Sequence, residues 1–254
     1  MPGAVTASAF AARRAGYLAI VGAAVLWGSL GPAARLALRE GVGALELSFW
    51  RALLAGAAYA VHAAALGRVR IARRDLPAVL GFALLGVTLF YGAYFQAVRV
   101  GGAALAAVLL YTAPAWVALA AALWLHERLT ASALGALALT LAGVALVAFG
   151  AGGEARLNPA ALGWGLTAGL AYASYYLFGK RYFPHYAAPT LFLYALPLGA
   201  AALWPLVEFA EKSAVAWLTI AFIALVPTYA AYLLYSHGLR RVPATRAATV
   251  ATLE

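Results

Sequence analysis

Residues 81–113, GFALLGVTLFYGAYFQAVRVGGAALAAVLLYTA, align without a gap with residues 222–254, FIALVPTYAAYLLYSHGLRRVPATRAATVATLE. The positions that carry this alignment are Tyr91, Tyr94 and Arg99, which recur as Tyr232, Tyr235 and Arg240. Both stretches are largely hydrophobic. Self-similarity at a fixed offset is the sequence signature of an internal repeat, so the chain is predicted to contain two copies of one membrane unit.

A second echo of the repeat lies further towards the start of each copy. Trp27-Gly28-Ser29, followed by Arg35, aligns with Tyr172-Ala173-Ser174, followed by Lys180. Transporters built from such repeats hold their substrate near the bilayer midplane, where the two copies meet. The repeat therefore points to a transporter.

Composition indicates that the chain lies in a lipid bilayer. Hydrophobic residues make up 66% of the 254 residues and charged residues only 10%, whereas soluble domains carry roughly 25% charge. The apolar runs have about the length of 20 residues that a helix needs to cross a bilayer, and they lack the alternation of a transmembrane barrel. The chain has no cysteine, so disulfides and thiolate metal sites are excluded, and we expect neither metal nor cofactor.

The hydrophobic runs predict an all-α membrane protein with eight complete helices and part of a ninth. The predicted helices lie at residues 17–37, 45–66, 76–98, 101–123, 132–150, 160–179, 188–208 and 216–238, and the ninth begins at 244. We expect a first five-helix repeat at 1–152 and a second repeat at 153–254 that ends within its fourth helix. An intact protein of this kind would continue through ten helices, and Leu253-Glu254 is either native or left by cloning.

The positive charges predict the orientation of the helices. With a cytoplasmic N-terminus, most of the 18 lysines and arginines fall in cytoplasmic segments, as the positive-inside rule requires. Because each copy holds an odd number of helices, the second copy enters the bilayer the other way round. This places Arg99 outside and Arg240 inside, so the repeats are expected to be inverted. The formal charge of +10 thus reflects topology, and we expect no nucleic acid partner.

Four short motifs, taken in order, resemble the EamA-type drug/metabolite transporter superfamily. They are Trp27-Gly28-Ser29, Arg51, Pro114 and Glu127-Arg128-Leu129-Thr130. The family usually has glycine where this chain has His126, and the last one to two helices of the family are absent here. The resemblance implies a ten-helix carrier of the inner (cytoplasmic) membrane that moves small metabolites, often outward, with members that export amino acids, including aromatic ones.

The repeated tyrosines are the first candidates for substrate binding. Tyr91 and Tyr94 share one helix face because they are three residues apart, and Tyr232 and Tyr235 repeat that face. If the copies pack about a pseudo-two-fold axis, the four phenol groups converge on a central cavity. Tyrosine offers a flat apolar surface for stacking and a hydroxyl for orienting a polar group. The alternative is an aromatic belt at the membrane interface, because each pair lies towards one end of its helix.

A second group of candidates lies in the middle of predicted helices, where a belt is not expected. Trp27 and Ser29 precede a Gly and Pro interruption at Pro32, and Tyr172 and Ser174 are their counterparts. An interrupted transmembrane helix is a pointer to a binding site because it frees backbone groups. Close helix packing is the alternative explanation.

Polar residues at membrane depth complete this set, since they are costly unless they face protein or water. Tyr111 and Thr112 stand beside Pro114 in the fourth helix and join the candidate substrate site. Gln96 and its counterpart His237 lie near helix ends. For His237 the alternatives are a hydrated histidine at a loop edge and a role in proton coupling.

Two charged residues are candidates for coupling or for recognition of a polar group. Arg51 is a basic residue inside a predicted helix, where it either snorkels outward near Glu46 or binds the carboxylate of a substrate. Glu254 would lie deep in the ninth helix, where a carboxylate binds a cation, a proton or an amine.

These observations predict a secondary carrier that exports small amphipathic metabolites, such as aromatic or hydrophobic amino acids, by alternating access through a central cavity. No phosphate-binding Gly-x-x-x-x-Gly-Lys-Ser/Thr motif is present in the sequence, so direct use of ATP is not expected, and an enzyme is disfavoured. The expected partners are a small-molecule substrate, membrane lipid and a second copy in a homodimer. The alternatives are a broad-specificity drug efflux carrier and a non-transporting membrane protein whose aromatic face binds lipid or a partner subunit.

Overall fold

The computed structural model describes residues 2–124, 131–150 and 158–253, and every regular element within these ranges is a helix. The helices up to residue 150 are α1 (Pro2–Gly28), α2 (Leu30–Arg39), α3 (Ala44–Ala65), η1 (Arg73–Asp75), α4 (Leu76–Phe82), η2 (Ala83–Leu89), α5 (Phe90–Gly101), α6 (Ala103–Leu110), α7 (Ala113–Trp124) and α8 (Ala131–Gly150). Those after residue 158 are α9 (Pro159–Tyr182), α10 (Ala188–Leu203), η3 (Trp204–Leu206), α11 (Ala214–Ile223), η4 (Ala224–Ala230), α12 (Ala231–Leu239) and α13 (Ala244–Ala251). The prediction of an all-α chain is confirmed.

Five helical stretches of the described residues are long and apolar enough to cross a bilayer. They are Ala11–Arg39, Ala44–Ala65, Arg73–Gly101, Ala188–Leu206 and Ala214–Leu239, and Ala104–Ala120 forms a shorter apolar stretch. Large apolar side chains such as Leu139 and Leu218 are exposed on the outside of the bundle. In a bilayer this surface faces lipid chains, which cover apolar side chains as a protein interior would.

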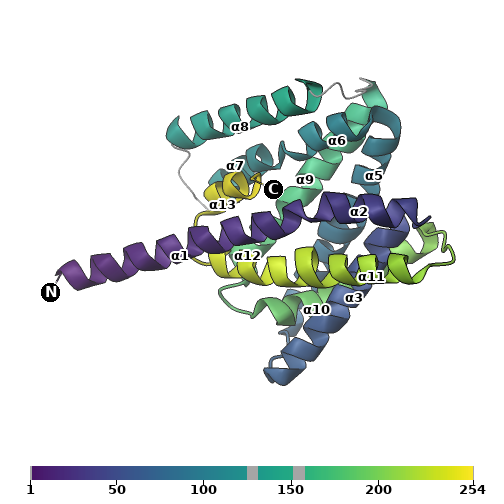
Figure 1. The fold of residues 1–254 in the computed structure, drawn as a ribbon. Helices are drawn as coiled ribbons and strands as arrows, with labels where there is room; N and C mark the ends of the chain where they lie inside the picture. The colour runs from purple at the N-terminus through teal and green to yellow at the C-terminus, as the bar shows by residue number, and fades with distance from the viewer. Residues whose placement is uncertain (1, 125–130, 151–157, 254) are drawn as a thin grey trace.

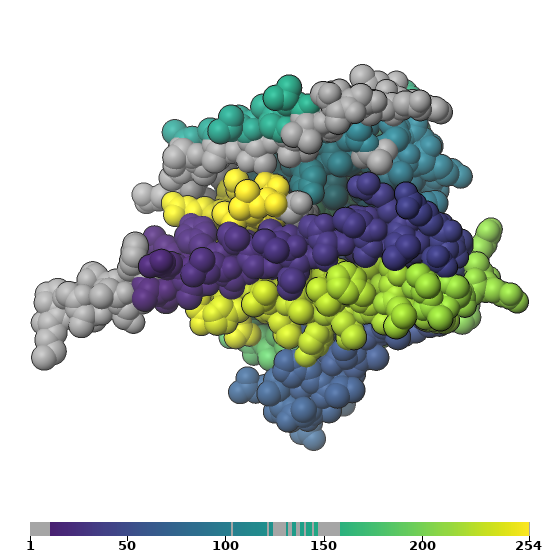
Figure 2. Space-filling model, viewed as in Figure 1, coloured from purple at the N-terminus to yellow at the C-terminus, as the bar shows by residue number. Residues whose placement is uncertain are grey.

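Helices from the start and the end of the chain pack against each other. The most extensive contacts join α3 to α10, α5 to α9 and α1 to α12, and α2 lies along α11 (Figure 1). In the space-filling view, α1 and α2 form one band and α11 and α12 an adjacent band on the same face (Figure 2). The α3 and α10 backbones approach closely at Gly56, where a Cβ atom would lie 2.6 Å from the ring of Pro197.

Two of the predicted helices are interrupted, and each break lies just before a proline. α1 and α2 meet at Ser29, three residues before Pro32, and α6 and α7 meet at Tyr111 and Thr112, before Pro114. Proline lacks the N–H that a helix interior needs, but it is tolerated in a first turn, where that group has no partner within the helix. The expectation that Pro32 itself breaks the helix was wrong by one turn, because the new helix begins before it.

Each of the two aligned stretches contains a seven-residue π-helix at the matching position. η2 covers Ala83–Leu89 and η4 covers Ala224–Ala230, and Tyr91 and Tyr232 follow these segments at the same spacing. π-Helical turns are uncommon and occur mostly at functional sites. The alignment that suggested a repeat is thus accompanied by the same rare backbone conformation in both stretches.

Candidate functional site

Aromatic side chains from five helices meet in the interior of the bundle. The group, called here the tyrosine cluster, consists of residues that are each 8% exposed or less, namely Trp27, Phe90, Tyr91, Tyr172, Tyr175, Tyr176, Tyr232 and Tyr235. They come from α1, α5, α9 and α12, and Phe82 of α4 adjoins them by contact with Tyr175. The phenol groups of this cluster therefore lie where helices from both ends of the chain meet.

The rings of the tyrosine cluster pack with the offset and edge-on geometries that aromatic pairs prefer. Tyr175 is stacked on Tyr232, with 5.2 Å between ring centroids and 13° between planes. Trp27 meets Tyr232 edge-on at 5.4 Å and Tyr235 at 5.5 Å. Tyr172 is stacked on Phe90 at 5.1 Å. Each of these contacts joins two helices that are distant in the sequence.

The burial of these residues bears on the aromatic-belt alternative. A belt residue places its ring at the lipid and headgroup boundary, yet Tyr91, Tyr232 and Tyr235 are 6%, 2% and 1% exposed. Tyr94 differs from them because it is only half-buried, and its ring lies 6.3 Å from that of Phe90. Three of the four repeated tyrosines thus lie in the protein interior, and Tyr94 lies at its edge.

Some buried polar atoms of the site have no hydrogen-bond partner among the described residues. They include the hydroxyl groups of Tyr91 and Tyr235 and the Oε1 atom of Gln96. Leaving a buried polar group unpaired costs about 1–3 kcal/mol, so most such groups in proteins have partners. Unpaired hydroxyls in the interior of a helix bundle are groups that a bound molecule could satisfy.

Arg51 is the charged member of the site. Its side chain is buried on α3, its Nε donates to Oγ1 of Thr228 at 2.9 Å, and its guanidinium carbon lies 5.0 Å from the ring centre of Tyr91. Within the described part of the chain no carboxylate is within ion-pair distance of it. The snorkelling alternative does not describe Arg51, because the side chain turns into the tyrosine cluster and Glu46 pairs with Lys212 instead.

The smaller hydroxyl residues form hydrogen bonds within their own helical turns. Ser29 donates to the carbonyl of Leu26, and Thr112 donates to that of Leu109, both at 2.6 Å and both at helix breaks. Ser174 does the same within α9, to Ala171 at 2.6 Å. Since each hydroxyl hydrogen is used locally, these residues retain only acceptor lone pairs for a ligand.

The remaining predicted residues lie away from the tyrosine cluster or beyond the described ranges. Tyr111 is half-buried at the break between α6 and α7, and His237 is exposed on α12. For His237 the structure agrees with a hydrated residue near the end of its helix. Glu254 and the Glu127-Arg128-Leu129-Thr130 motif lie outside the described residues.

Sequence reasoning missed four residues of the site. Tyr175 and Tyr176 pack in the centre of the cluster, Phe90 stacks on Tyr172, and Thr228 holds Arg51. Tyr175 and Tyr176 could have been found, because they lie three and four residues after Tyr172 and therefore on its helix face. Thr228 carried no such signal, since its partner is on a distant helix.

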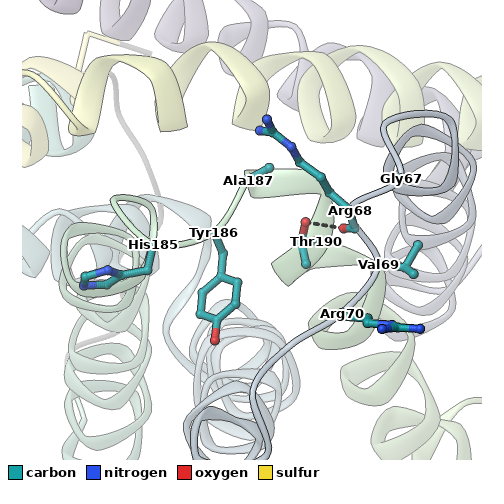
Figure 3. Close-up of a pocket in the computed structure, with 8 residues that line it drawn as sticks. All are labelled: Gly67, Arg68, Val69, Arg70, His185, Tyr186, Ala187 and Thr190. Carbon is teal, nitrogen blue, oxygen red and sulfur yellow. Dashed lines mark hydrogen bonds between the residues drawn. The ribbon is translucent and has the colours of Figure 1, made fainter.

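A separate pocket lies where the segment after α3 meets the segment before α10. It has a volume of about 620 Å³ and is lined by Gly67, Arg68, Val69, Arg70, His185, Tyr186, Ala187 and Thr190 (Figure 3). Thr190 donates to the carbonyl of Arg68 at 2.5 Å, whereas the side chains of Arg68 and Arg70 extend away from each other (Figure 3). The pocket therefore has no point at which its charged groups converge.

Tyr186, which lines this pocket, forms hydrogen bonds with the segment before α4. Its hydroxyl donates to Oδ2 of Asp75 at 2.6 Å and accepts from the backbone N–H of Ala72 at 3.2 Å. The hydrogen bond to the carboxylate raises the pKa of Tyr186 above its ordinary value. Nearby, burial and repulsion from Arg241 and Arg68 lower the pKa of Arg240. These contacts join the segment before α4 to the segment before α10.

Comparison with known proteins identifies the family. Residues 14–149 and 159–254 match the EamA-like transporter family. The chain is 31% identical over 234 residues to a protein of Streptantibioticus cattleyicolor named "Probable terminal-alkyne amino-acid exporter", covering 88% of this chain and 76% of that protein. It is 30% identical over 181 residues to an uncharacterized transporter of Archaeoglobus fulgidus, covering 67% of this chain and 63% of that protein.

A solved structure shares the fold. A crystal structure with 19% sequence identity superposes with a TM-score of 0.79, over 93% of this chain and 83% of that chain. At this identity the likeness concerns the fold alone. The family match covers nearly the whole chain and agrees with the resemblance that the sequence motifs indicate, so this chain is a member of the EamA-like transporter family of membrane transporters.

Proposed function

We propose that this chain is a secondary carrier that exports small amphipathic metabolites, namely amino acids with aromatic or hydrophobic side chains. In this proposal the tyrosine cluster, which includes Trp27, forms the substrate site. Arg51 binds the substrate carboxylate, and the unpaired hydroxyls of Tyr91 and Tyr235 orient its polar groups. The site alternates between the two sides of the membrane.

The observation that carries this proposal is the buried guanidinium of Arg51. A charge buried without a counter-charge is strongly unfavourable, and in the described residues Arg51 has a threonine hydroxyl and a tyrosine ring as neighbours but no carboxylate. A guanidinium presents paired N–H donors that match the two oxygens of a carboxylate. A carboxylate-bearing solute would supply the missing charge.

The chemistry of the surrounding rings favours an apolar or aromatic side chain on that solute. The stacked pair of Tyr175 and Tyr232 and the indole of Trp27 offer flat apolar faces, and such rings bind other rings by stacking. The relative from Streptantibioticus cattleyicolor is named as an amino-acid exporter, which supports the same class of solute for this chain. The alternative of a broad drug carrier gives no role to a buried cation.

The same proposal includes two inverted repeats, at 1–152 and 153–254, with a cytoplasmic N-terminus in the inner membrane. The paired π-helices η2 and η4 support a repeat, and the distribution of arginines supports the orientation. A non-transporting protein with an aromatic face for lipid fits less well, because the cluster is buried. Dimer formation and a ten-helix intact protein remain parts of the proposal.

Flux measurements in proteoliposomes test the proposal. Labelled phenylalanine and leucine are compared with phenethylamine, which lacks the carboxylate, with a cationic dye, and with a fluorescent lipid. We expect transport of the amino acids and a reduction of at least tenfold, about 1.4 kcal/mol, in the Arg51→Gln variant. Arg39→Gln, which changes an exposed arginine of α2, is the matched control and should transport normally. Equal transport of phenylalanine and phenethylamine by the unaltered protein would exclude the role of Arg51.

A further inference from the structure

A box of aromatic rings surrounds the ammonium group of Lys212. The Nζ atom lies 5.3 Å from the ring centre of Trp217, 5.6 Å from that of Trp50 and 5.9 Å from that of Phe209. It also forms an ion pair with Oε1 of Glu46. We call Glu46, Trp50, Phe209 and Trp217 the ammonium box. It shares no residue with the tyrosine cluster: Glu46 and Trp50 lie in the first two turns of α3, Trp217 in the first turn of α11, and Phe209 in the segment before α11.

The ammonium box has a buried carboxylate, while its rings Phe209 and Trp217 are 42% and 41% exposed. The side chain of Glu46 is 1% exposed and that of Lys212 is 6% exposed. Glu46 also accepts from Nε1 of Trp50 and from the backbone N–H of Ala210, both at 3.4 Å. A carboxylate that is buried and surrounded by donors and ring faces is a group that requires a cation beside it.

Lys212 belongs to a short irregular segment, whereas three of the four residues of the ammonium box belong to helices. Glu46 and Trp50 are on α3 and Trp217 is on α11, while Lys212 lies in the segment 207–213 that joins η3 to α11. Within this segment the neighbouring residues Glu208 and Glu211 are exposed. A displacement of this segment would remove the lysine and leave a carboxylate and two indoles in place.

We propose that Glu46, Trp50 and Trp217 form a binding site for the ammonium group of a small molecule, and that Lys212 occupies this site as an internal ligand. Aromatic rings around a cation, with a carboxylate, are the groups by which proteins recognise primary and quaternary amines. The site itself does not depend on the identity of the transported solute.

One consequence does rest on the proposed function. Glu46 precedes Arg51 by five residues on α3, which corresponds to about 7.5 Å along the helix axis. An amino acid released from Arg51 towards this end of the bundle would meet the box with its amine. By displacing Lys212, it would detach the segment 207–213 from α3.

The reactivity of Lys212 tests the site in the unaltered protein. The chain has two lysines, Lys180 and Lys212, and acylation of each by a water-soluble N-hydroxysuccinimide ester is followed by mass spectrometry of peptides. Tetramethylammonium chloride is compared with sodium chloride at the same concentration, so that ionic strength is constant. We expect tetramethylammonium to raise the acylation rate of Lys212 at least threefold, with saturation, and to leave Lys180 unchanged. Equal rates of Lys212 acylation in the two salts would overturn the proposal.

Variants provide a second measurement that does not rely on acylation. Lys212→Met removes the ammonium group from the box and leaves Glu46 without its cation, and we expect it to bind tetramethylammonium at least tenfold more tightly than the unaltered protein in calorimetric titration. Adding Glu46→Gln to that variant should abolish the gain, and Glu211→Gln, a neighbouring exposed carboxylate, should behave as the unaltered protein does. If Lys212→Met folds but binds no more tightly, the site is not an ammonium site. Either failure would leave the amino-acid flux of the proposed function unaffected, so the two proposals fail separately.

Discussion

Arg51 donates a hydrogen bond through Nε to Oγ1 of Thr228 at 2.9 Å, although 177 positions separate the two residues in the chain. The Thr228 hydroxyl in turn donates to the carbonyl of Ile223 at 2.8 Å, across the π-helix η4. The position of the guanidinium on α3 therefore depends on the backbone of a helix from the other end of the chain. This link connects the charged group of the candidate site to a rare backbone conformation.

Replacing Thr228 by valine should remove the hydrogen bond that holds the guanidinium of Arg51 in position. The substitution keeps the side-chain shape but leaves a buried N–H of a charged group without its acceptor, which costs about 1–3 kcal/mol. We expect lower thermal stability in detergent and a several-fold rise in KM for amino-acid transport, with recovery of both in Thr228→Ser. Thr167→Val is the control, since the hydroxyl of Thr167 bonds to the carbonyl of Gly163 within its own helix. An unchanged KM in a destabilised Thr228→Val protein would show that the contact is structural alone.

Removing the hydroxyl of Tyr91 or Tyr235 should reduce transport without reducing the stability of the protein. Neither hydroxyl has a partner among the described residues, so phenylalanine at these positions loses no hydrogen bond and leaves no unpaired buried group. We expect the free energy of unfolding to be unchanged or raised by about 1 kcal/mol, while transport falls at least threefold because the solute loses a partner. Normal transport in both variants would remove these hydroxyls from the substrate site.

Two glycines offer a matched test of helix packing. A Cβ on Gly56 would lie 2.6 Å from Cγ and Cδ of Pro197, whereas a Cβ on Gly92 would meet nothing within 4 Å. We expect Gly56→Ala to destabilise the protein by about 1–3 kcal/mol through overpacking. Gly92→Ala should be neutral or stabilise by up to about 1 kcal/mol, because alanine restricts the unfolded chain and favours helix. Thermal unfolding of both variants in the same detergent compares them, and equal stability would contradict the close approach of α3 and α10.

Tyr186 should titrate later than an ordinary tyrosine. Its pKa is raised because its hydroxyl donates to the carboxylate of Asp75. Since the folded pKa lies above the unfolded one, the stabilisation is fully present below the ordinary tyrosine pKa of about 10. It is lost as the pH rises through the folded pKa. Absorbance titration of tyrosinate should therefore lose a late component in Tyr186→Phe.

Asp75→Asn provides the check on this assignment. Removing the charge of the acceptor should bring the titration of Tyr186 closer to that of a free phenol, with the other tyrosines unaffected. If Tyr186 titrates equally late in the Asp75→Asn variant, the carboxylate is not the cause of the raised pKa.

The sequence predicted the helices well because membrane insertion leaves a strong one-dimensional signal. Each predicted range contains a helix in the described residues, since runs of apolar residues must form backbone hydrogen bonds within themselves. The helix breaks at Ser29 and Tyr111 could not be located as well from the sequence. Their positions depend on how neighbouring helices pack, and the proline that follows each break indicates its position only to within about one turn.

Only some residues of the candidate site could be predicted from the sequence. Tyr91, Tyr232 and Tyr235 could be found because the alignment of residues 81–113 with 222–254 marks them, and their burial agrees with an interior position. The partners Thr228 and Lys212 could not be found, because they meet Arg51 and Glu46 across helices that are distant in the sequence. A pairing between remote segments leaves no periodicity in a single sequence.

The two π-helices have a geometric consequence for motion. Residues of an α-helix are spaced by about 100° around the axis, so rewinding η2 or η4 into regular α turns would rotate the downstream segment by one residue position. Tyr91 or Tyr232, which closely follow these segments, would then turn away from their present neighbours. Each of the two aligned stretches thus contains a point where a local change of winding would reorient a buried tyrosine.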